Sequence, residues 1–197
     1  MIITVASYKG GAGKTTTAVH IAAYLSESAP TALIDGDPNR SATAWSQRGT
    51  LPFTVVNEHQ GARAARMHEH LVFDTAARPS TDQLQELASG CDLLVIPANP
   101  DFLSLDALRQ TVQTLQRLKA ERYRILLTMI PPKPASDGDV ARTALTEAGL
   151  PLFVGSIRFL KAFKTAASEG KTVAGVKDPR AQFGWADYVA VGEELSR

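Results

Sequence analysis

The chain has 197 residues, of which 44% are hydrophobic and 21% are charged, and its formal net charge is +1. This composition is typical of one globular domain and excludes a disordered chain, a collagen-like repeat and a coiled-coil rod. The single cysteine, Cys91, cannot form an internal disulfide or supply the thiolates of an iron–sulfur cluster. No apolar run reaches the roughly eighteen residues of a membrane-spanning helix, and the near-neutral charge gives no global reason to expect nucleic acid.

Short apolar runs alternate with longer amphipathic segments along the whole chain. The predicted strands are residues 2–6, 31–34, 53–56, 70–73, 93–96, 124–128 and 152–154. The predicted helices are residues 14–26, 41–48, 81–88, 103–119, 140–148, 161–168 and 181–195. This alternation predicts an α/β fold, with a mostly parallel sheet of about seven strands and helices on both faces. Because no domain boundary is visible, we expect residues 1–197 to form a single domain.

A glycine-rich segment follows the first predicted strand and leads into the first predicted helix. Its sequence is Lys9-Gly10-Gly11-Ala12-Gly13-Lys14-Thr15-Thr16. Glycines let backbone N–H groups turn around an anion, and a helix N-terminus adds partial positive charge. Lys14 can then reach terminal phosphates, and the Thr15 hydroxyl can bind Mg²⁺. The alternative is a glycine-rich turn without a ligand, but the flanking strand and helix favour a phosphate-binding P-loop.

The segment is a variant of the usual phosphate loop. The ordinary pattern has glycine where this chain has Tyr8, and Lys9 adds a second lysine. This form resembles the deviant Walker A loop of the ParA/MinD superfamily, in which the first lysine reaches the ATP phosphates of the other subunit. The resemblance implies an ATP hydrolase with ATP and Mg²⁺ as cofactors and a homodimer in the ATP state. It also implies that Lys9 and Lys14 are catalytic.

Aspartates follow two other predicted strands. The sequence Asp35-Gly36-Asp37-Pro38-Asn39 resembles the family's DxDPQ segment, with asparagine in place of glutamine. By that resemblance Asp37 is catalytic and orients the attacking water, whereas Asp35 supports the Mg²⁺ shell; the alternative is a plain turn. Asp74 ends an apolar run, as in a Walker B segment, and is a further Mg²⁺ candidate, although Thr75-Ala76 replaces the usual Thr-Pro. Met129 and Pro131 are candidate contacts to adenine by resemblance; the alternative is that they are ordinary core or loop residues.

The resemblance points to a minimal ParA. The one cysteine excludes relatives that hold a cluster, and the acid pair Glu193-Glu194 near the C-terminus argues against a membrane-binding tail. The chain begins at the first strand, so we expect no helix-turn-helix extension. The resemblance then implies a cytoplasmic, nucleoid-associated protein that binds double-stranded DNA without sequence preference and does not bind membranes. It also implies a ParB-like partner that stimulates weak intrinsic hydrolysis, while the cargo stays open: plasmid, chromosome or protein assembly.

A local excess of basic residues is the candidate DNA site. Residues 158–180 contain six basic side chains and two acidic ones, Glu169 and Asp178. The candidate DNA contacts among them are Arg158, Lys161, Lys164 and Lys171. The alternative is a solvated helix face. A second hypothesis for the whole chain is a small ATP-dependent ligase of the dethiobiotin synthetase or cobyrinate amidase kind, which would bind an acid substrate and show no ATP-dependent DNA affinity.

Overall fold

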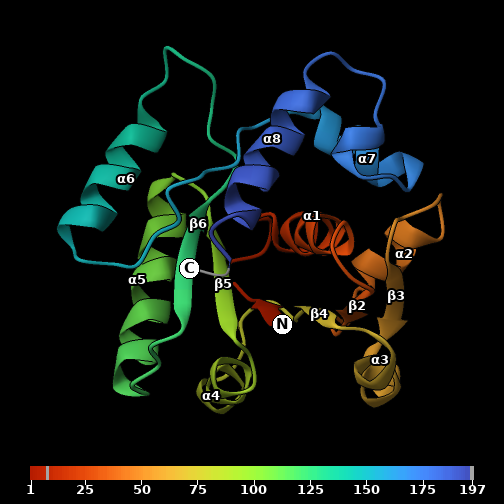
Figure 1. Cartoon of the computed structure of the whole chain (residues 1–197). Coiled ribbons are helices and arrows are strands. Elements are labelled where there is room, and N and C mark those ends of the chain that lie inside the picture. Colours follow the sequence, from red (N-terminus) through yellow and green to blue (C-terminus); the bar gives the residue numbers. More distant parts are fainter. Residues whose placement is uncertain (8, 196–197) are drawn as a thin grey trace.

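The computed structural model describes residues 1–7 and 9–195, and only the backbone of residues 102–107. Its centre is a six-stranded sheet of order β3-β2-β4-β1-β5-β6, in which every neighbouring pair is parallel (Figure 1). The strands are β1 (Ile2–Val5), β2 (Thr31–Asp35), β3 (Thr54–Asn57), β4 (His70–Asp74), β5 (Leu93–Ala98) and β6 (Tyr123–Leu127). The predicted α/β parallel fold is thus confirmed.

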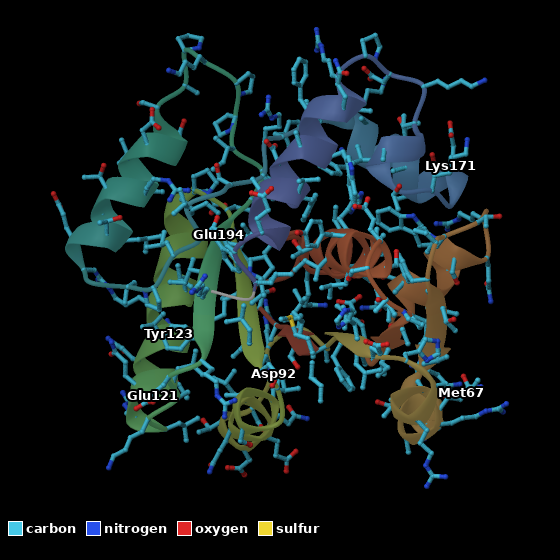
Figure 2. The ribbon with its side chains drawn as sticks, in the orientation of Figure 1. Met67, Asp92, Glu121, Tyr123, Lys171 and Glu194 are labelled. Atoms are coloured by element: carbon cyan, nitrogen blue, oxygen red, sulfur yellow. The ribbon has the colours of Figure 1, made fainter. Side chains whose placement is uncertain are left out.

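The seventh predicted strand, residues 152–154, is reduced to one bridge between Ile125 and Leu152. Phe153 is still fully buried, but the next residue, Val154, is 84% exposed. The N–H groups of Val154 and Gly155 donate to the two carboxylate oxygens of Glu194, at 2.9 and 2.8 Å. Glu194, labelled in Figure 2, therefore takes the place of a strand partner, and the sheet ends at β6 within the described residues.

Helices cover both faces of the sheet (Figure 1). They are α1 (Lys14–Ser26), α2 (Ser41–Ser46), α3 (Gly61–Met67), α4 (Thr81–Ser89), α5 (Phe102–Arg117), α6 (Asp137–Glu147), α7 (Lys161–Glu169) and α8 (Ala181–Gly192). One buried cluster joins the sheet to α1, α2, α7 and α8, and two others join its opposite face to α3, α4, α5 and α6. The described residues contain no helix long and apolar enough to cross a membrane.

The strand register places the chain's functional candidates at one edge of the sheet. Asp35 and Asp74 are the last residues of neighbouring strands and are direct partners in the register. Asp74 is in turn the partner of Val5, the last residue of β1, which precedes the phosphate loop. In parallel α/β sheets, ligands bind at the carboxyl ends of the strands. The fold therefore brings three segments that are distant in sequence to a single site.

An aromatic cluster connects the first helix to the C-terminal part of the chain. The buried His20 ring stacks on Tyr188 at a centroid distance of 4.7 Å and meets Phe163 and Trp45 edge-on. Its Nδ1 lies 2.7 Å from the Thr16 carbonyl oxygen. Burial lowers the pKa of His20 to about 4, although the Thr16 carbonyl opposes this effect, so the ring is neutral at pH 7. The cluster holds α2, α7 and α8 against the helix that follows the phosphate loop.

Candidate functional site

The phosphate loop has the backbone that its glycines predict. Gly11 and Gly13 have φ angles of 82° and 80°, in the left-handed region that glycine adopts without strain. Gly13 caps α1 with no side-chain hydrogen bond, and the first turn of α1 contains no acidic residue. The N–H groups at this helix start can therefore bind an anion. Tyr8, whose position breaks the ordinary pattern, lies outside the described residues.

Lys14 lies between two carboxylates at the base of the loop. Its side chain is 9% exposed, and its Nζ is 2.9 Å from Asp37 Oδ2 and 3.4 Å from Asp74 Oδ1. A buried ammonium group needs such partners because its desolvation is otherwise costly. The arrangement confirms that the three segments converge. It also means that a bound phosphate competes with Asp37 and Asp74 for Lys14.

The surroundings of Asp37 favour its ionised form. Burial alone raises its pKa, but the hydrogen bond from Lys14 and the backbone and side-chain hydrogen bonds from Asn39 outweigh this effect and hold the pKa below its usual value. Both Asn39 bonds end on Oδ1, at 2.9 Å, while Lys14 takes Oδ2. Asn39, which replaces the usual glutamine, therefore orients the carboxylate. A fixed, ionised carboxylate beside the phosphate loop can position a water molecule.

Asp35 is turned away from the phosphate loop. Its Oδ2 accepts hydrogen bonds from the Thr43 N–H at 2.8 Å and the Thr43 hydroxyl at 2.6 Å, and its Oδ1 accepts from the Asp37 N–H at 3.3 Å. These contacts fix the start of α2 and the segment that carries Asp37. In this structure, Asp35 supports the site through Asp37 and Thr43. Thr43 was not among the residues singled out in the sequence, because its role depends on the turn of α2.

Asp74 is the carboxylate that best fits a cation. It is fully buried, and its Oδ2 has no hydrogen-bond partner among the described residues. Burial raises its pKa to about 6, although the charge of Lys14 and the Thr15 hydroxyl oppose this shift. An unpartnered buried carboxylate oxygen is costly and is usually satisfied by a water or an ion. Together with the Thr15 hydroxyl, Asp74 could hold Mg²⁺, either directly or through water.

An open groove of about 660 Å³ runs over the phosphate loop. Its walls are formed mainly by the phosphate loop and α2, with one residue of α7. The lining residues are Lys9, Gly10, Gly11, Gly13, Lys14, Thr15, Thr16, Asp37, Asn39, Ser41, Ala44, Trp45, Arg48, Ala77, Met129 and Ala167. Ala12 of the loop is instead buried. Ser41, Trp45 and Arg48 were not expected in the site. Their contribution comes from the packing of α2 against α7, which the sequence pattern does not reveal.

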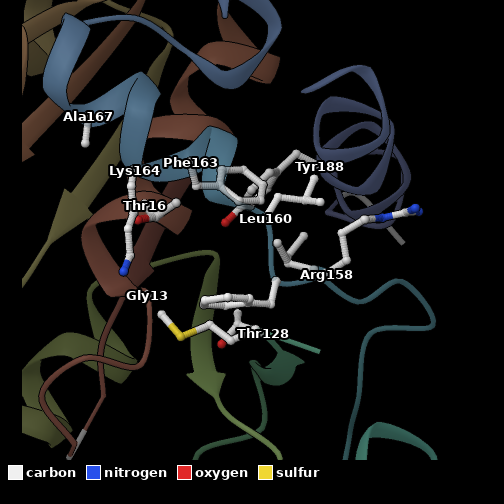
Figure 3. Close-up of a pocket in the computed structure, with 12 residues that line it drawn as sticks. Gly13, Thr16, Thr128, Arg158, Leu160, Phe163, Lys164, Ala167 and Tyr188 are labelled. Carbon is white, nitrogen blue, oxygen red and sulfur yellow. The ribbon is translucent and has the colours of Figure 1, made fainter. Parts of the chain in front are cut away.

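A smaller cavity of about 160 Å³, shown in Figure 3, shares part of its lining with the groove. It is lined by Gly13, Thr16, Thr128, Met129, Ile157, Arg158, Phe159, Leu160, Phe163, Lys164, Ala167 and Tyr188. Gly13, Thr16, Met129 and Ala167 line both spaces. Pro131 lines neither. The apolar residues at 157–163 were missed because before the fold is known they resemble ordinary core positions.

The basic residues of the predicted DNA patch lie in different surroundings. Arg158 forms a two-point ion pair with Asp187, with both nitrogen–oxygen distances at 2.8 Å. Lys171 is 2.9 Å from Glu169. Figure 3 shows the amino end of Lys164 pointing toward Gly13, at the mouth of the smaller cavity. Lys161, at the start of α7, is exposed. The patch is therefore less uniformly positive than its sequence suggests.

A strand–loop–helix phosphate cradle with a buried lysine and a strand-end aspartate defines a P-loop nucleotide-binding domain. Residues 3–173 match the family model of the CobQ/CobB/MinD/ParA nucleotide binding domain, and the chain belongs to this family. The chain is therefore an ATP-binding ATPase of the ParA/MinD type.

Relatives extend the match to the whole chain. Maintenance of carboxysome distribution protein A of Gloeobacter kilaueensis is 34% identical over 203 residues, which cover 100% of this chain and 94% of the relative. Protein ParA of Rhizobium radiobacter is 29% identical over 147 residues, which cover 66% of this chain and 65% of the relative. Because the first relative is matched along nearly its full length, the similarity concerns the whole protein rather than its phosphate loop alone.

Solved structures confirm the fold. The structure of apo McdA from Cyanothece has a TM-score of 0.78 at 17% identity and covers 100% of this chain and 99% of the other. The MinC:MinD cell division complex of Aquifex aeolicus contains a chain with a TM-score of 0.77 at 15% identity, covering 99% and 95%. At these identities the likeness establishes the architecture.

Proposed function

We propose that this protein is a ParA-type positioning switch, in which ATP closes a homodimer that binds DNA without sequence preference and a partner protein stimulates hydrolysis. The observation that carries the proposal is the second loop lysine, Lys9, which lines the same groove as Lys14 and is 35% exposed. One lysine, Lys14, suffices to bind phosphates within the subunit. An accessible second lysine at the groove is suited to reach the nucleotide of another subunit.

The other proposed roles fall to residues of the phosphate loop and the strand ends. Lys14 and the loop N–H groups bind the phosphates, and Asp37 positions the attacking water. Bound Mg²⁺ would neutralise phosphate charge, with Thr15 and Asp74 as its nearest protein groups and Asp35 in support through Asp37. Because Asp37 and Lys14 are paired before nucleotide binds, we expect slow intrinsic turnover until a partner completes the site.

The names of the relatives support a role in positioning. The relative matched over 100% of this chain is named for carboxysome distribution, and the shorter match is named ParA. We therefore favour positioning of a cellular cargo, through a ParB-like or other adaptor, over the ligase alternative. A ligase would use the groove and the smaller cavity for an acid substrate and would show no nucleotide-dependent affinity for DNA.

DNA binding in three nucleotide states tests the proposal. Filter binding or gel shift to random duplex DNA should show strong binding with MgATP and weak binding with ADP or without nucleotide. A non-hydrolysed ATP analogue should preserve the complex, since the switch depends on the bound nucleotide. Equal DNA affinity in all states would contradict the switch. ATP-driven phosphorylation or amidation of an acid substrate would support the ligase instead.

A further inference from the structure

The second loop lysine already has an ionic partner within its own subunit. Lys9 Nζ lies 2.8 Å from Asp101 Oδ1, and the two side chains are 35% and 48% exposed. Asp101 lies between β5 and α5, directly before the first residue of α5. It is 92 residues away from Lys9 in sequence. The pair joins the phosphate loop to the loop between β5 and α5. Lys9 is therefore positioned before any second subunit arrives.

A second contact fixes these two loops relative to each other. The Thr128 hydroxyl oxygen lies 2.9 Å from the Ala12 carbonyl oxygen and 3.1 Å from Asn99 Oδ1. Thr128 and Ala12 are each 2% exposed, so this connection is shielded from water. It holds the segment from Asn99 to Asp101 beside the phosphate loop. An ion pair between preorganised partners loses less side-chain entropy than one between freely moving chains.

We propose that Asp101 is a positioning residue that retains Lys9 within its own subunit and so opposes dimerisation until ATP is bound on both subunits. The inference rests on the proposed function, in which Lys9 acts on the nucleotide of the partner. To do so, Lys9 must exchange one carboxylate for the phosphates of the other subunit. ATP offers more negative charge than ADP, and an empty site offers none, so ATP compensates the loss of Asp101 better than either.

The expected effect is moderate because the pair is partly exposed. Exposed ion pairs shift an equilibrium by about 1.4-fold to 5-fold. A two-fold symmetric dimer breaks two such pairs, one in each subunit, so the effects multiply. Neutralising Asp101 should therefore strengthen the ATP dimer by about twofold to thirtyfold. Nucleotide binding to the monomer should not change, since Lys9 does not serve the phosphates of its own subunit.

Asp101 also stands at the start of α5, where aspartate stabilises a helix by capping and through the helix dipole. Two variants separate this structural role from the proposed one. Asp101→Asn keeps a good capping residue but removes the charge, whereas Asp101→Glu keeps the charge on a poorer cap. Asp139→Asn, in the exposed first turn of α6, is a matched loss of charge elsewhere.

Sedimentation of a concentration series with Mg²⁺ and a non-hydrolysed ATP analogue measures the dimer dissociation constant. Nucleotide affinity is measured separately at protein concentrations where the monomer dominates. Asp101→Asn should lower the dimer constant twofold to thirtyfold, with Asp101→Glu and Asp139→Asn close to wild type. The gain should shrink in 1 M salt, which screens the pair. A purely structural role for Asp101 would not produce this salt dependence.

The outcomes separate this inference from the proposed function. If the wild-type protein dimerises with ATP and Asp101→Asn leaves the dimer constant unchanged or raises it, the role of Asp101 is overturned and the switch stays intact. The same follows if Asp101→Glu dimerises as tightly as Asp101→Asn. Wild-type and Asp101→Asn proteins that bind the analogue but both stay monomeric would overturn the dimeric switch, and this inference with it.

Discussion

The contact between Lys14 and Asp37 joins the residue that binds phosphate to the residue that positions water. Their separation is 2.9 Å, in side chains that are 9% and 8% exposed, so the phosphates of ATP compete with Asp37 for Lys14. Asp37→Asn keeps the acceptor for Asn39 but removes the negative charge. We expect ATP turnover to fall about 10²- to 10⁴-fold, the range for removal of a positioned acid–base group. MgATP affinity should rise severalfold because Lys14 then has one competitor fewer.

Steady-state hydrolysis and equilibrium nucleotide binding, measured on the same preparations, test these two effects. Asp139→Asn, an exposed carboxylate in α6, is the control and should change neither. Turnover that survives in Asp37→Asn would remove Asp37 from the chemistry. A variant that loses MgATP affinity would instead show that Asp37 holds the nucleotide or its metal ion.

The raised pKa of Asp74 predicts how MgATP binding depends on pH. Burial raises this pKa to about 6, so below pH 6 the carboxyl must release a proton before it can serve a cation. Affinity should therefore fall about tenfold per pH unit below 6 and level off above it. Asp74→Asn should bind MgATP more weakly at pH 7. In Asp74→Asn the fall of affinity that comes from protonation of Asp74 should be absent. Any fall that comes from protonation of the nucleotide phosphates should remain.

Stability of the nucleotide-free protein gives an independent check with a definite sign. A carboxyl whose pKa is higher in the folded state than in the unfolded state destabilises the fold as pH rises through that interval, here about 4 to 6. Asp74→Asn should therefore be more stable than wild type at pH 7, by on the order of 2–3 kcal/mol in urea unfolding. An unchanged or lower free energy of unfolding at pH 7 would contradict the assigned shift.

Among secondary-structure elements, the contact between α2 and α7 forms the wall of the groove. Trp45 Nε1 donates to the Lys171 carbonyl oxygen at 2.9 Å, and Arg48 donates to the Ala167 carbonyl oxygen at 3.4 Å. Gly170 ends α7 with a φ of 64°, and a Cβ there would clash with the Gly49 backbone nitrogen. The backbones at Gly170 and Gly49 are therefore in direct contact, and no side chain fits at Gly170.

Gly170→Ala tests this contact, and the chain offers a matched control. Gly149, which follows α6, has a φ of 69° but no atom of the described residues within 4 Å of its Cβ position. Gly149→Ala should lose only the preference for the left-handed conformation, about 1 kcal/mol of stability in urea unfolding. Gly170→Ala should lose roughly 3 kcal/mol or more because the Gly49 segment must also move. It should also weaken ATP binding, whereas equal effects of both substitutions would contradict the close contact.

The sequence pattern best predicts the helices and strands whose own residues carry a clear apolar pattern. The strands that begin at residues 2, 31 and 70 were expected at the positions where the structure has them, as were the helices that begin at 14, 81 and 161. The helix α3 was missed, because only Ala64 of its seven residues is buried and no apolar stripe marks it. The segment expected as a strand at 152–154 still bonds to Ile125 through Phe153, but the N–H groups of Val154 and Gly155 bond to Glu194, so the pairing with β6 stops after one bridge.

The same distinction applies to the site. The phosphate loop and Asp74 could be predicted because strand ends meet at one edge of a parallel sheet, whatever the details of side-chain packing. The direction of a carboxylate could not, and Asp35 turns toward Thr43 rather than toward the phosphate loop. Nor does spacing reveal that Arg158 pairs with Asp187, 29 residues later. The first contact depends on how α2 turns back toward the end of β2, and the second on how α8 packs beside residue 158; no local pattern encodes either.

For the molecule as a whole, charge placement matters more than net charge. The formal net charge is +1, so attraction to DNA must come from one face. Arg158 is paired with Asp187 and Lys171 with Glu169, so Lys161 and Lys164 are the proposed DNA contacts that form no ion pair with a described acidic residue. Lys164 also borders the smaller cavity, where its amino group could serve the nucleotide. Lys161 is exposed and lines neither the groove nor the cavity, which makes it the sharpest test of DNA binding.

Lys161→Ala should weaken ATP-dependent DNA binding and reduce the slope of log affinity against log salt by about 2, because a dimer presents the residue twice. MgATP affinity and ATP-driven dimerisation should stay as in wild type. Arg122→Gln is the control: it removes one exposed positive charge just before β6, at the opposite end of the strands from the phosphate loop. If both substitutions change the slope equally, DNA senses only the overall charge; a loss confined to Lys161→Ala places the DNA on the α7 face, beside the nucleotide that controls it.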